Sequence, residues 1–195
     1  MDHLAAIDLG LSGRVAHDKI ARKVFLTYPT QAFVGNEELQ YEILNEVAEQ
    51  WAVPITSIHV CGSAKLGVSI HKARAFVAGQ SDLDLAIIDE RLFIGYMEAV
   101  LNLTKGYTDG SRFPLVKGVS YKEQYLAYVA KGMLRPDLMP VSEMRAEWTN
   151  FFGRLSAKHN REFKSISAMI YLSERFFESK QRSVIRGRVG MGVVK

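Results

Sequence analysis

The chain has 195 residues, of which 48% are hydrophobic and 24% charged, a composition that is typical of a globular protein and excludes a disordered one. Lys and Arg together number 25 against 21 Asp and Glu, so the net charge of +4 favours anionic partners without by itself indicating nucleic-acid binding. Cys61 is the only cysteine, which excludes an intramolecular disulfide and a thiolate metal cage, and we expect a reducing, cytoplasmic setting.

The organisation of the chain predicts one domain. The N-terminal stretch MDHLAAIDLGLSGRVAHDK begins acidic and lacks a continuous apolar segment, so we expect no signal peptide. No apolar run approaches the ~20 residues that a membrane-spanning helix needs. In the absence of repeats and low-complexity tracts, we expect a single domain over residues 1–195. We divide it into a core at about 37–140, a C-terminal helical part at about 141–185 and a mobile tail at 186–195.

Two helices are predicted before the first strand. Residues 14–26 fit a first amphipathic helix, and Pro29 predicts an irregular crossing after it. The stretch NEELQYEILNEVAEQWAVP is a clearer helix, because Asn36 can cap it, acidic residues fill its first turn and Pro54 follows its end. Its buried stripe consists of apolar residues at helical spacing, namely Leu39, Ile43, Val47 and Trp51.

Two short strands are predicted in the middle of the chain. Residues 58–61 form the first, which ends abruptly at Gly62. The segment DLDLAII at 82–88 forms the second, because its apolar residues are of strand length and are bounded by polar ones. We expect a helix at 91–104, and the turn-rich stretch KGYTDGSRFP connects it to the last third of the chain.

That last third is predicted to be mostly helical. The apolar residues between Tyr121 and Val129 can share one helix face, and the stretch GMLRPDLMP is either a short strand or a loop. A final helix is expected at about 160–182. Its apolar face would carry Phe163, Ile166, Ile170 and Phe177.

Asp82 and Asp84 stand out because they interrupt an apolar strand. Burying an ionised carboxylate costs several kcal/mol unless it is paired or bound to a metal, and two such groups also repel each other. The period-two geometry of a strand places both on one face, with Leu83 and Leu85 on the opposite face. Carboxylates in that arrangement can share a hard cation such as Mg²⁺, which also accepts phosphate oxygens. The pair therefore predicts a metal site.

The end of the preceding strand supplies groups suited to phosphate. Gly62 allows the backbone to approach a phosphate closely, and the Ser63 hydroxyl and neighbouring amides can donate to it. Lys65 adds a positive charge nearby. A triphosphate held here, with its metal on Asp82 and Asp84, would be set up for in-line attack by an acceptor hydroxyl.

In these residues the sequence resembles the nucleotidyltransferase superfamily that includes DNA polymerase beta. The shared pattern is a hydrophobic strand, Gly-Ser, a helix and a strand reading Asp-hydrophobic-Asp, seen here as HVCGS followed by SDLDLAII. The resemblance covers about residues 37–90 and is greatest to the minimal bacterial nucleotidyltransferases of toxin–antitoxin and antiphage defence systems. It implies an α/β (α+β) fold with a small mixed sheet, helices mainly on one side and a C-terminal helix. It also implies that Gly62 and Ser63 contact the nucleotide while Asp82 and Asp84 bind Mg²⁺ or Mn²⁺.

The sequence departs from that pattern in two respects. Residues 64–81, which separate Ser63 from Asp82, are more than the family usually has, so a loop is expected there. Its basic residues His71, Lys72 and Arg74 either contact phosphate or nucleic acid or form a solvated loop. The third carboxylate, which active members commonly supply from a later strand, has Asp137 as its best candidate. Asp109 in a turn and Glu123 on a predicted helix surface fit less well.

Two further groups have competing interpretations. Cys61 fits a small buried residue better than a nucleophile, because no orienting triad accompanies His59. A set of basic residues near the C-terminus either meets an acceptor nucleic acid or the triphosphate, or is a solvated helix end favoured by the helix dipole. This set comprises Arg175, Lys180, Arg182, Arg186 and Arg188.

We therefore expect an enzyme that transfers a nucleoside monophosphate from an NTP to a hydroxyl acceptor and releases pyrophosphate. The acceptor would be a nucleotide or oligonucleotide, an RNA end or a protein side chain, and a co-encoded protein partner is plausible. The alternative is a catalytically degenerate module that binds nucleotide or neutralises a partner without turnover.

Overall fold

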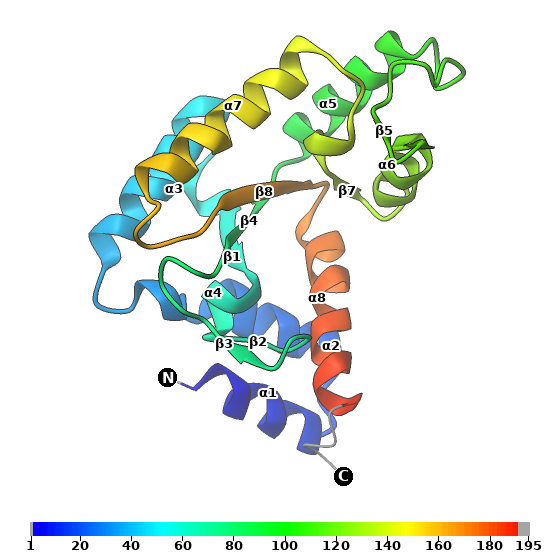
Figure 1. Ribbon diagram of the computed structural model, residues 1–195. Helices are drawn as coiled ribbons and strands as arrows, with labels where there is room; N and C mark the ends of the chain where they lie inside the picture. The colour runs from blue at the N-terminus through cyan, green and yellow to red at the C-terminus, as the bar shows by residue number, and fades with distance from the viewer. Residues whose placement is uncertain (1, 191–195) are drawn as a thin grey trace.

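The computed structural model describes residues 2–190 and centres on a four-stranded mixed sheet (Figure 1). The strands lie in the order β1 (Ile58–Cys61), β4 (Leu83–Ile88), β8 (Ile166–Tyr171) and β7 (Met133–Leu134). β1 is antiparallel to β4 and β7 is antiparallel to β8, whereas the two central strands β4 and β8 are parallel. This mixed architecture of helices around a small sheet agrees with the predicted fold class.

The larger core lies on the face of the sheet that is covered by α3 (Glu37–Trp51), α5 (Glu90–Leu103) and α7 (Glu143–Lys158). Alternate residues of β4 enter it, as the period of a strand requires, and they are Leu83, Leu85 and Ile87. Trp51 stacks on Phe152 of α7 with ring centroids 5.4 Å apart, and its indole N–H donates to the Tyr96 hydroxyl of α5 at 2.9 Å. The aromatic contacts therefore hold the three helices to one another.

A second cluster covers the opposite face of the sheet. It joins Ala86 of β4 to α1 (His3–Ser12), α2 (His17–Ala21), the π-helical segment η1 (Arg22–Thr27) and α8 (Glu174–Gly190). Ion pairs from Arg22 to Glu178 and from Arg188 to Asp8 connect α8 to the N-terminal helices. Helices thus pack on both faces of the sheet, and the prediction that they lie mainly on one side is wrong. The residues of β4 that alternate with Leu83 and Leu85 face α8.

Short elements fill the connections. α4 follows β1 directly, and a hairpin of β2 and β3 lies between α4 and β4, within the segment that was predicted to contain a loop. A second hairpin, of β5 and β6, precedes α6. Their bounds are α4 Gly62–Leu66, β2 Val68–Ser69, β3 Arg74–Ala75, β5 Leu115–Val116, β6 Val119–Ser120 and α6 Lys122–Val129. Single turns of 3-10 helix lie at Gln31–Phe33 (η2), Ile55–Ser57 (η3) and Pro136–Leu138 (η4). No helix within residues 2–190 has the length and apolar character needed to cross a bilayer.

The structure confirms the predicted helix after Asn36, the strands at 58–61 and 82–88, the helix at 91–104 and the one between Tyr121 and Val129. The helix predicted at 160–182 is wrong in its first half, because residues 166–171 form the central strand β8. Ile166 and Ile170 are four residues apart, a spacing that fits one face of either a helix or a strand. Here they point into the larger core with the two-residue period of a strand.

Two further boundaries differ from the sequence predictions. The helix predicted at 14–26 is the short α2 followed by η1, and an additional helix, α1, precedes it with Asp2 as its N-cap. The Asp2 carboxylate accepts hydrogen bonds from the amides of Leu4 and Ala5, which favours the start of α1. At the other end, residues 186–190 of the predicted tail belong to α8, and 191–195 lie outside the described residues.

Candidate functional site

The register of three strands brings the predicted motif residues together at one edge of the sheet. Cys61 at the end of β1 pairs with Asp84 near the start of β4, so the Gly62-Ser63 turn follows directly beside the two aspartates. Because Asp84 alternates with Leu83 and Leu85, its carboxylate lies on the face opposite the larger core. We call the group of Asp82, Asp84, Gly62 and Ser63 the aspartate site.

Gly62 is in direct contact with one of the carboxylates. Its φ of +63° is in the left-handed region, which favours glycine, and a Cβ at this position would lie 2.6 Å from Oδ2 of Asp84. Any larger residue would adopt a strained backbone conformation and would have to push the Asp84 carboxylate aside. The Gly-Ser turn and the aspartates therefore form one compact site.

Two serines complete the aspartate site and were not predicted: Ser167 lies in β8, and Ser165 directly precedes that strand. The parallel register places Ser167 beside Asp84, and the Ser167 hydroxyl lies 3.4 Å from Oδ1 of that residue. The Ser165 hydroxyl donates to Oδ1 of Asp82 at 2.7 Å. The alternation of Ser165 and Ser167 with the apolar Ile166 and Ala168 is the sequence signal that could have identified this strand and its polar face.

The electrostatics of Asp84 show a shortage of positive charge. Solvent reaches its side chain, but protein on the other sides desolvates the carboxylate, and this desolvation together with the charge of Asp82 raises its pKa. The Ser167 hydrogen bond and the charge of Lys72 act in the opposite direction. Among residues 2–190, no Lys or Arg forms an ion pair with Asp82 or Asp84.

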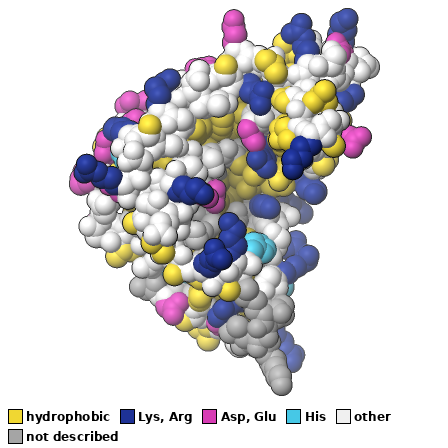
Figure 2. Space-filling view, in the orientation of Figure 1, with side chains coloured by type: hydrophobic (Ala, Val, Ile, Leu, Met, Phe, Trp, Pro, Cys, Tyr) yellow, Lys and Arg dark blue, Asp and Glu magenta, His cyan; other side chains and the backbone are white. Residues whose placement is uncertain are grey.

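Two lysines lie near the aspartate site, and within residues 2–190 neither forms an ion pair with its carboxylates. Lys72 lies in the turn between β2 and β3, and its charge acts on Asp84; Lys180 of α8 acts on the neighbouring Cys61. The turn packs on α8, where a Cβ at Gly187 would lie 3.6 Å from the His71 ring. Figure 2 shows a hollow in the surface below α6 and α7, with Lys and Arg side chains and a histidine at its lower edge.

Lys65, which was predicted to add a charge for phosphate, lies in a different environment. Its side chain is buried, and its ammonium donates to the backbone carbonyl of Tyr28 at 2.6 Å. Desolvation lowers its pKa to about 8. Lys65 thus anchors the segment between η1 and η2 to α4, and its ammonium already has a partner.

Asp137, the predicted third carboxylate, lies in η4 after β7. Its carboxylate forms a bidentate ion pair with Arg135, with the shorter contact at 2.6 Å, and its backbone carbonyl accepts from Arg145 at 3.1 Å. The hydrogen bonds of Asp82 and Asp84 within residues 2–190 come from Ser165 and Ser167 and not from the segment around Asp137. The structure therefore gives Asp137 its own cationic partner.

Cys61 lies beside the aspartate site, but its environment disfavours a nucleophile. Desolvation, with the charge of Asp84 in addition, raises the pKa of its thiol. The amide of Gln181 from α8 donates to its sulfur at 3.6 Å, which favours a packing role. His59 is paired with the ring of Phe177, and burial lowers its pKa.

Chemically, the aspartate site offers two carboxylates, three serine hydroxyls and a glycine turn, an oxygen-rich group that suits a hard divalent cation. Asp84 has the Ser167 hydroxyl beside it and no ion-pair partner within residues 2–190, so a bound cation would offset the repulsion from Asp82. Comparisons with protein-family models, with curated proteins and with solved structures find no match for this chain.

Proposed function

We propose that this protein is a metal-dependent nucleotidyltransferase, which transfers a nucleoside monophosphate from an NTP to a hydroxyl acceptor and releases pyrophosphate. The observation that carries the proposal is the contact between Gly62 and Asp84. It joins a turn suited to phosphate to a carboxylate pair that lacks a cation, and a metal–triphosphate complex needs both.

The residues of the aspartate site would have different roles in transfer. Asp82 and Asp84 would hold Mg²⁺ or Mn²⁺, which when bound polarises phosphate oxygens and activates the acceptor hydroxyl. The Ser63 hydroxyl and the backbone amides of its turn donate to phosphate oxygens. Lys72 and Lys180 offset the charge of the triphosphate. The acceptor oxygen bonds to the α-phosphorus while the bond from that phosphorus to pyrophosphate breaks, and the proton of the hydroxyl passes to solvent.

The class of acceptor is also part of the proposal. Cations from two elements, Lys72 and Lys180, favour an anionic acceptor such as a nucleotide, an oligonucleotide or an RNA end over a neutral protein side chain. A cytoplasmic enzyme of bacterial defence or of a toxin–antitoxin pair, with a co-encoded partner, fits this chemistry.

A specific observation supports a second candidate, a module that binds nucleotide without turnover. The segment beside the aspartates carries Ser165 and Ser167, which are hydroxyl residues without charge, and Asp137 is engaged by Arg135. Two carboxylates hold a second divalent cation less strongly than three, because each carboxylate contributes one negative charge to the site. If the wild type binds nucleotide without transferring it, Ser167→Asp should increase transfer, since it adds a carboxylate next to Asp84.

The test is incubation of purified protein with each labelled NTP and Mg²⁺ or Mn²⁺, with pyrophosphate and the labelled product measured. Asp82→Asn and Asp84→Asn should abolish transfer, whereas Asp18→Asn, an exposed carboxylate on α2, should not change it. Nucleotide binding without product in the wild type would favour the binding module. Absence of both binding and product would exclude both candidates.

A further inference from the structure

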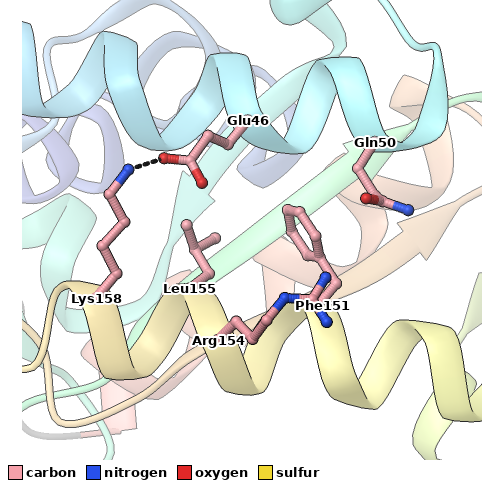
Figure 3. A pocket seen from close by; sticks show the side chains of 6 residues that line it. All are labelled: Glu46, Gln50, Phe151, Arg154, Leu155 and Lys158. Atoms are coloured by element: carbon pink, nitrogen blue, oxygen red, sulfur yellow. Dashed lines mark hydrogen bonds and ion pairs between the residues drawn. The ribbon is translucent and has the colours of Figure 1, made fainter.

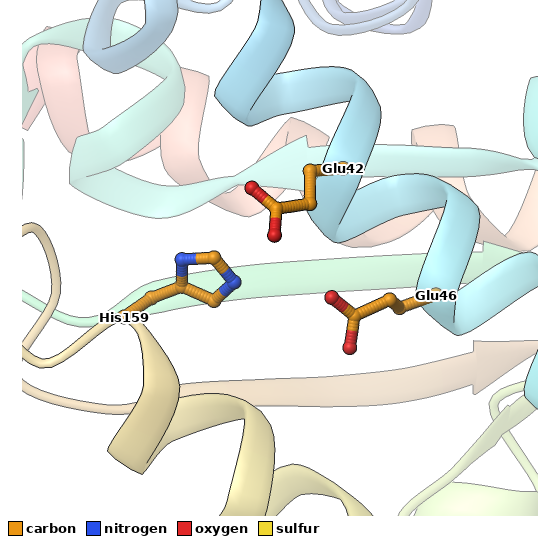
Figure 4. Close-up of side chains that lie close together, drawn as sticks. All are labelled: Glu42, Glu46 and His159. Carbon is orange, nitrogen blue, oxygen red and sulfur yellow. The ribbon is translucent and has the colours of Figure 1, made fainter.

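A second group of metal-ligand side chains connects α3 to the end of α7, on the opposite face of the sheet from the aspartate site. Glu42 and Glu46 are one turn apart and share a face of α3, and His159 is the C-cap residue of α7. One possible ligand atom from each residue lies within 4.8 Å of the other two. Figure 4 shows the three side chains converging on the space between the two helices. We call these three residues the glutamate–histidine cluster.

His159 provides an independent indication of a ligand. The residue is 5% exposed, and its Nε2 has no hydrogen-bond partner among residues 2–190. Buried ring nitrogens normally have a partner, because desolvating one without a hydrogen bond costs free energy. In Figure 4 the ring nitrogen farther from the backbone is directed toward the two carboxylates. An unpartnered imidazole therefore faces two negatively charged groups.

Lys158 shows that the cluster already attracts a cation. Its ammonium lies 2.6 Å from a carboxylate oxygen of Glu42 and forms a second ion pair with Glu46 (Figure 3). The lysine side chain is 48% exposed, so it can turn into solvent when another cation competes. A groove between α3 and α7 opens beside Glu46 and leaves room for that movement. Lys158 satisfies the carboxylates but leaves Nε2 of His159 without a partner.

We propose that Glu42, Glu46 and His159 bind a Zn²⁺ ion, which displaces Lys158. One imidazole nitrogen and two carboxylate oxygens form a set that Zn²⁺ accepts, with water in the fourth position. Mg²⁺ prefers oxygen ligands in octahedral geometry and suits this set less well. Tetrahedral ligands around Zn²⁺ are about 3.3 Å apart, so the carboxylates must move closer than the present separation of up to 4.8 Å. Glu42 is exposed and can make that movement.

A bound ion would link α3 and α7, two of the three helices that cover the larger core. α3 and α7 already share the contact of Trp51 with Phe152, and Zn²⁺ would connect them again at the C-terminal end of α7. Because a metal that binds only the folded state stabilises it, the midpoint of thermal unfolding should rise with Zn²⁺ concentration. This role is independent of nucleotidyl transfer.

The test uses protein without an affinity tag and starts from Asp82→Asn/Asp84→Asn, so that binding at the aspartate site does not contribute. Titration calorimetry with Zn²⁺ should give one equivalent bound, and Co²⁺ should give the visible absorption of a tetrahedral site. Glu42→Gln/Glu46→Gln in the same background should weaken binding at least ~100-fold, since it removes two of three ligands. Lys158→Met should tighten binding, because it removes the competing cation.

Glu49→Gln is the matched control, since Glu49 is an exposed carboxylate on the same helix that does not belong to the cluster, and it should leave Zn²⁺ affinity unchanged. His159→Gln should also weaken binding; if this buried substitution prevents folding, the glutamate variants still decide the question. The proposal is overturned if Glu42→Gln/Glu46→Gln binds Zn²⁺ as tightly as its parent. It is equally overturned if neither the parent nor Lys158→Met binds Zn²⁺ or forms the Co²⁺ band.

Discussion

The aspartate site and the glutamate–histidine cluster both place two carboxylates side by side, but their electrostatics are opposite. Desolvation and the charge of Asp82 raise the pKa of Asp84, with no ion pair to either aspartate within residues 2–190. A hydrogen bond from Lys158 lowers the pKa of Glu42. Within residues 2–190 the first site has no ion-pair partner, whereas the second has Lys158. Counting acidic residues would not have distinguished the two.

The backbone explains this contrast. The aspartates lie at the start of a strand whose neighbours contribute glycine and serine, residues that carry no charge. The glutamates lie on a helix face, where long side chains from the neighbouring α7 reach them. An oxygen-only site is suited to Mg²⁺, and the site that includes an imidazole is suited to Zn²⁺.

The largest expected effect is the loss of transfer when a charge of the aspartate site is removed. Asp84→Asn keeps the size of the side chain but weakens metal binding, and a catalytic metal contributes several kcal/mol to transition-state stabilisation. We expect kcat/KM to fall about a thousandfold or more. Asp137→Asn should change it less than about threefold, because the Arg135 pair holds that carboxylate. A loss as large in Asp137→Asn would show that Asp137 acts in the reaction.

The next effect concerns the contact that joins the turn to the aspartates. Gly62→Ala introduces a Cβ into the 2.6 Å space beside Asp84 and forces alanine into the left-handed region. Gly35→Ala is the matched control, since Gly35 has a φ of +80° and a Cβ added there would have nothing within 4 Å. The control should lose about 1–2 kcal/mol of unfolding free energy in urea titrations, and Gly62→Ala clearly more. Equal losses would mean that the contact with Asp84 contributes nothing.

A smaller effect should appear in the pH dependence of stability. Because the folded-state pKa of Asp84 is raised, the folded protein is disfavoured by ionisation of this group, and its stability falls as pH rises through the carboxyl range. Asp84→Asn should therefore be more stable than the wild type at pH 7. The difference should vanish below the unfolded-state pKa of about 3.9, where both states are protonated.

Thermal unfolding across this pH range, with EDTA present, measures the difference. Mg²⁺ at pH 7 should stabilise the wild type and reduce its disadvantage relative to Asp84→Asn. Asp18→Asn serves as the control for loss of one exposed carboxylate. A wild type that is more stable than Asp84→Asn at pH 7 without metal would contradict the charge shortage.

The sequence predicted the half of the aspartate site that lies on β1 and β4. Gly62 ends a short apolar run, and Asp82 and Asp84 alternate with apolar residues in another, so the sequence indicated both strands. β8 was missed because Ile166 and Ile170 also fit a helix, and the serines beside Ile166 carry no charge to attract attention. The α7 helix did have a signal, since Trp148, Phe152 and Leu155 repeat at helical spacing.

The glutamate–histidine cluster could not be predicted in the same way. Glu42 and Glu46 read as an ordinary solvated helix face, and His159 lies in a distant part of the sequence without metal-ligand spacing to them. Only the packing of α7 on α3 brings the imidazole to the carboxylates. Local sequence patterns therefore predicted the strand residues of the aspartate site. They could not predict the glutamate–histidine cluster, which long-range packing of helices forms.

The smallest expected effect is the change in stability when the glutamate–histidine cluster loses Lys158, a cationic partner that the aspartate site does not have within residues 2–190. Lys158 lowers the pKa of Glu42, so the pair stabilises the folded protein above the unfolded-state pKa of about 4.3, and this contribution is lost as pH falls through the lower folded-state value. In EDTA at pH 7, Lys158→Met should unfold at a slightly lower temperature than the wild type; the decrease should be small because a solvated ion pair contributes little. It should still exceed the decrease caused by Lys131→Met, the control at an exposed lysine. The gap should narrow toward pH 4. With Zn²⁺ present, Lys158→Met should become more stable than the wild type, since its glutamate pair has no competing ammonium. If Lys158→Met stays less stable than the wild type at saturating Zn²⁺, Lys158 does not compete with the metal.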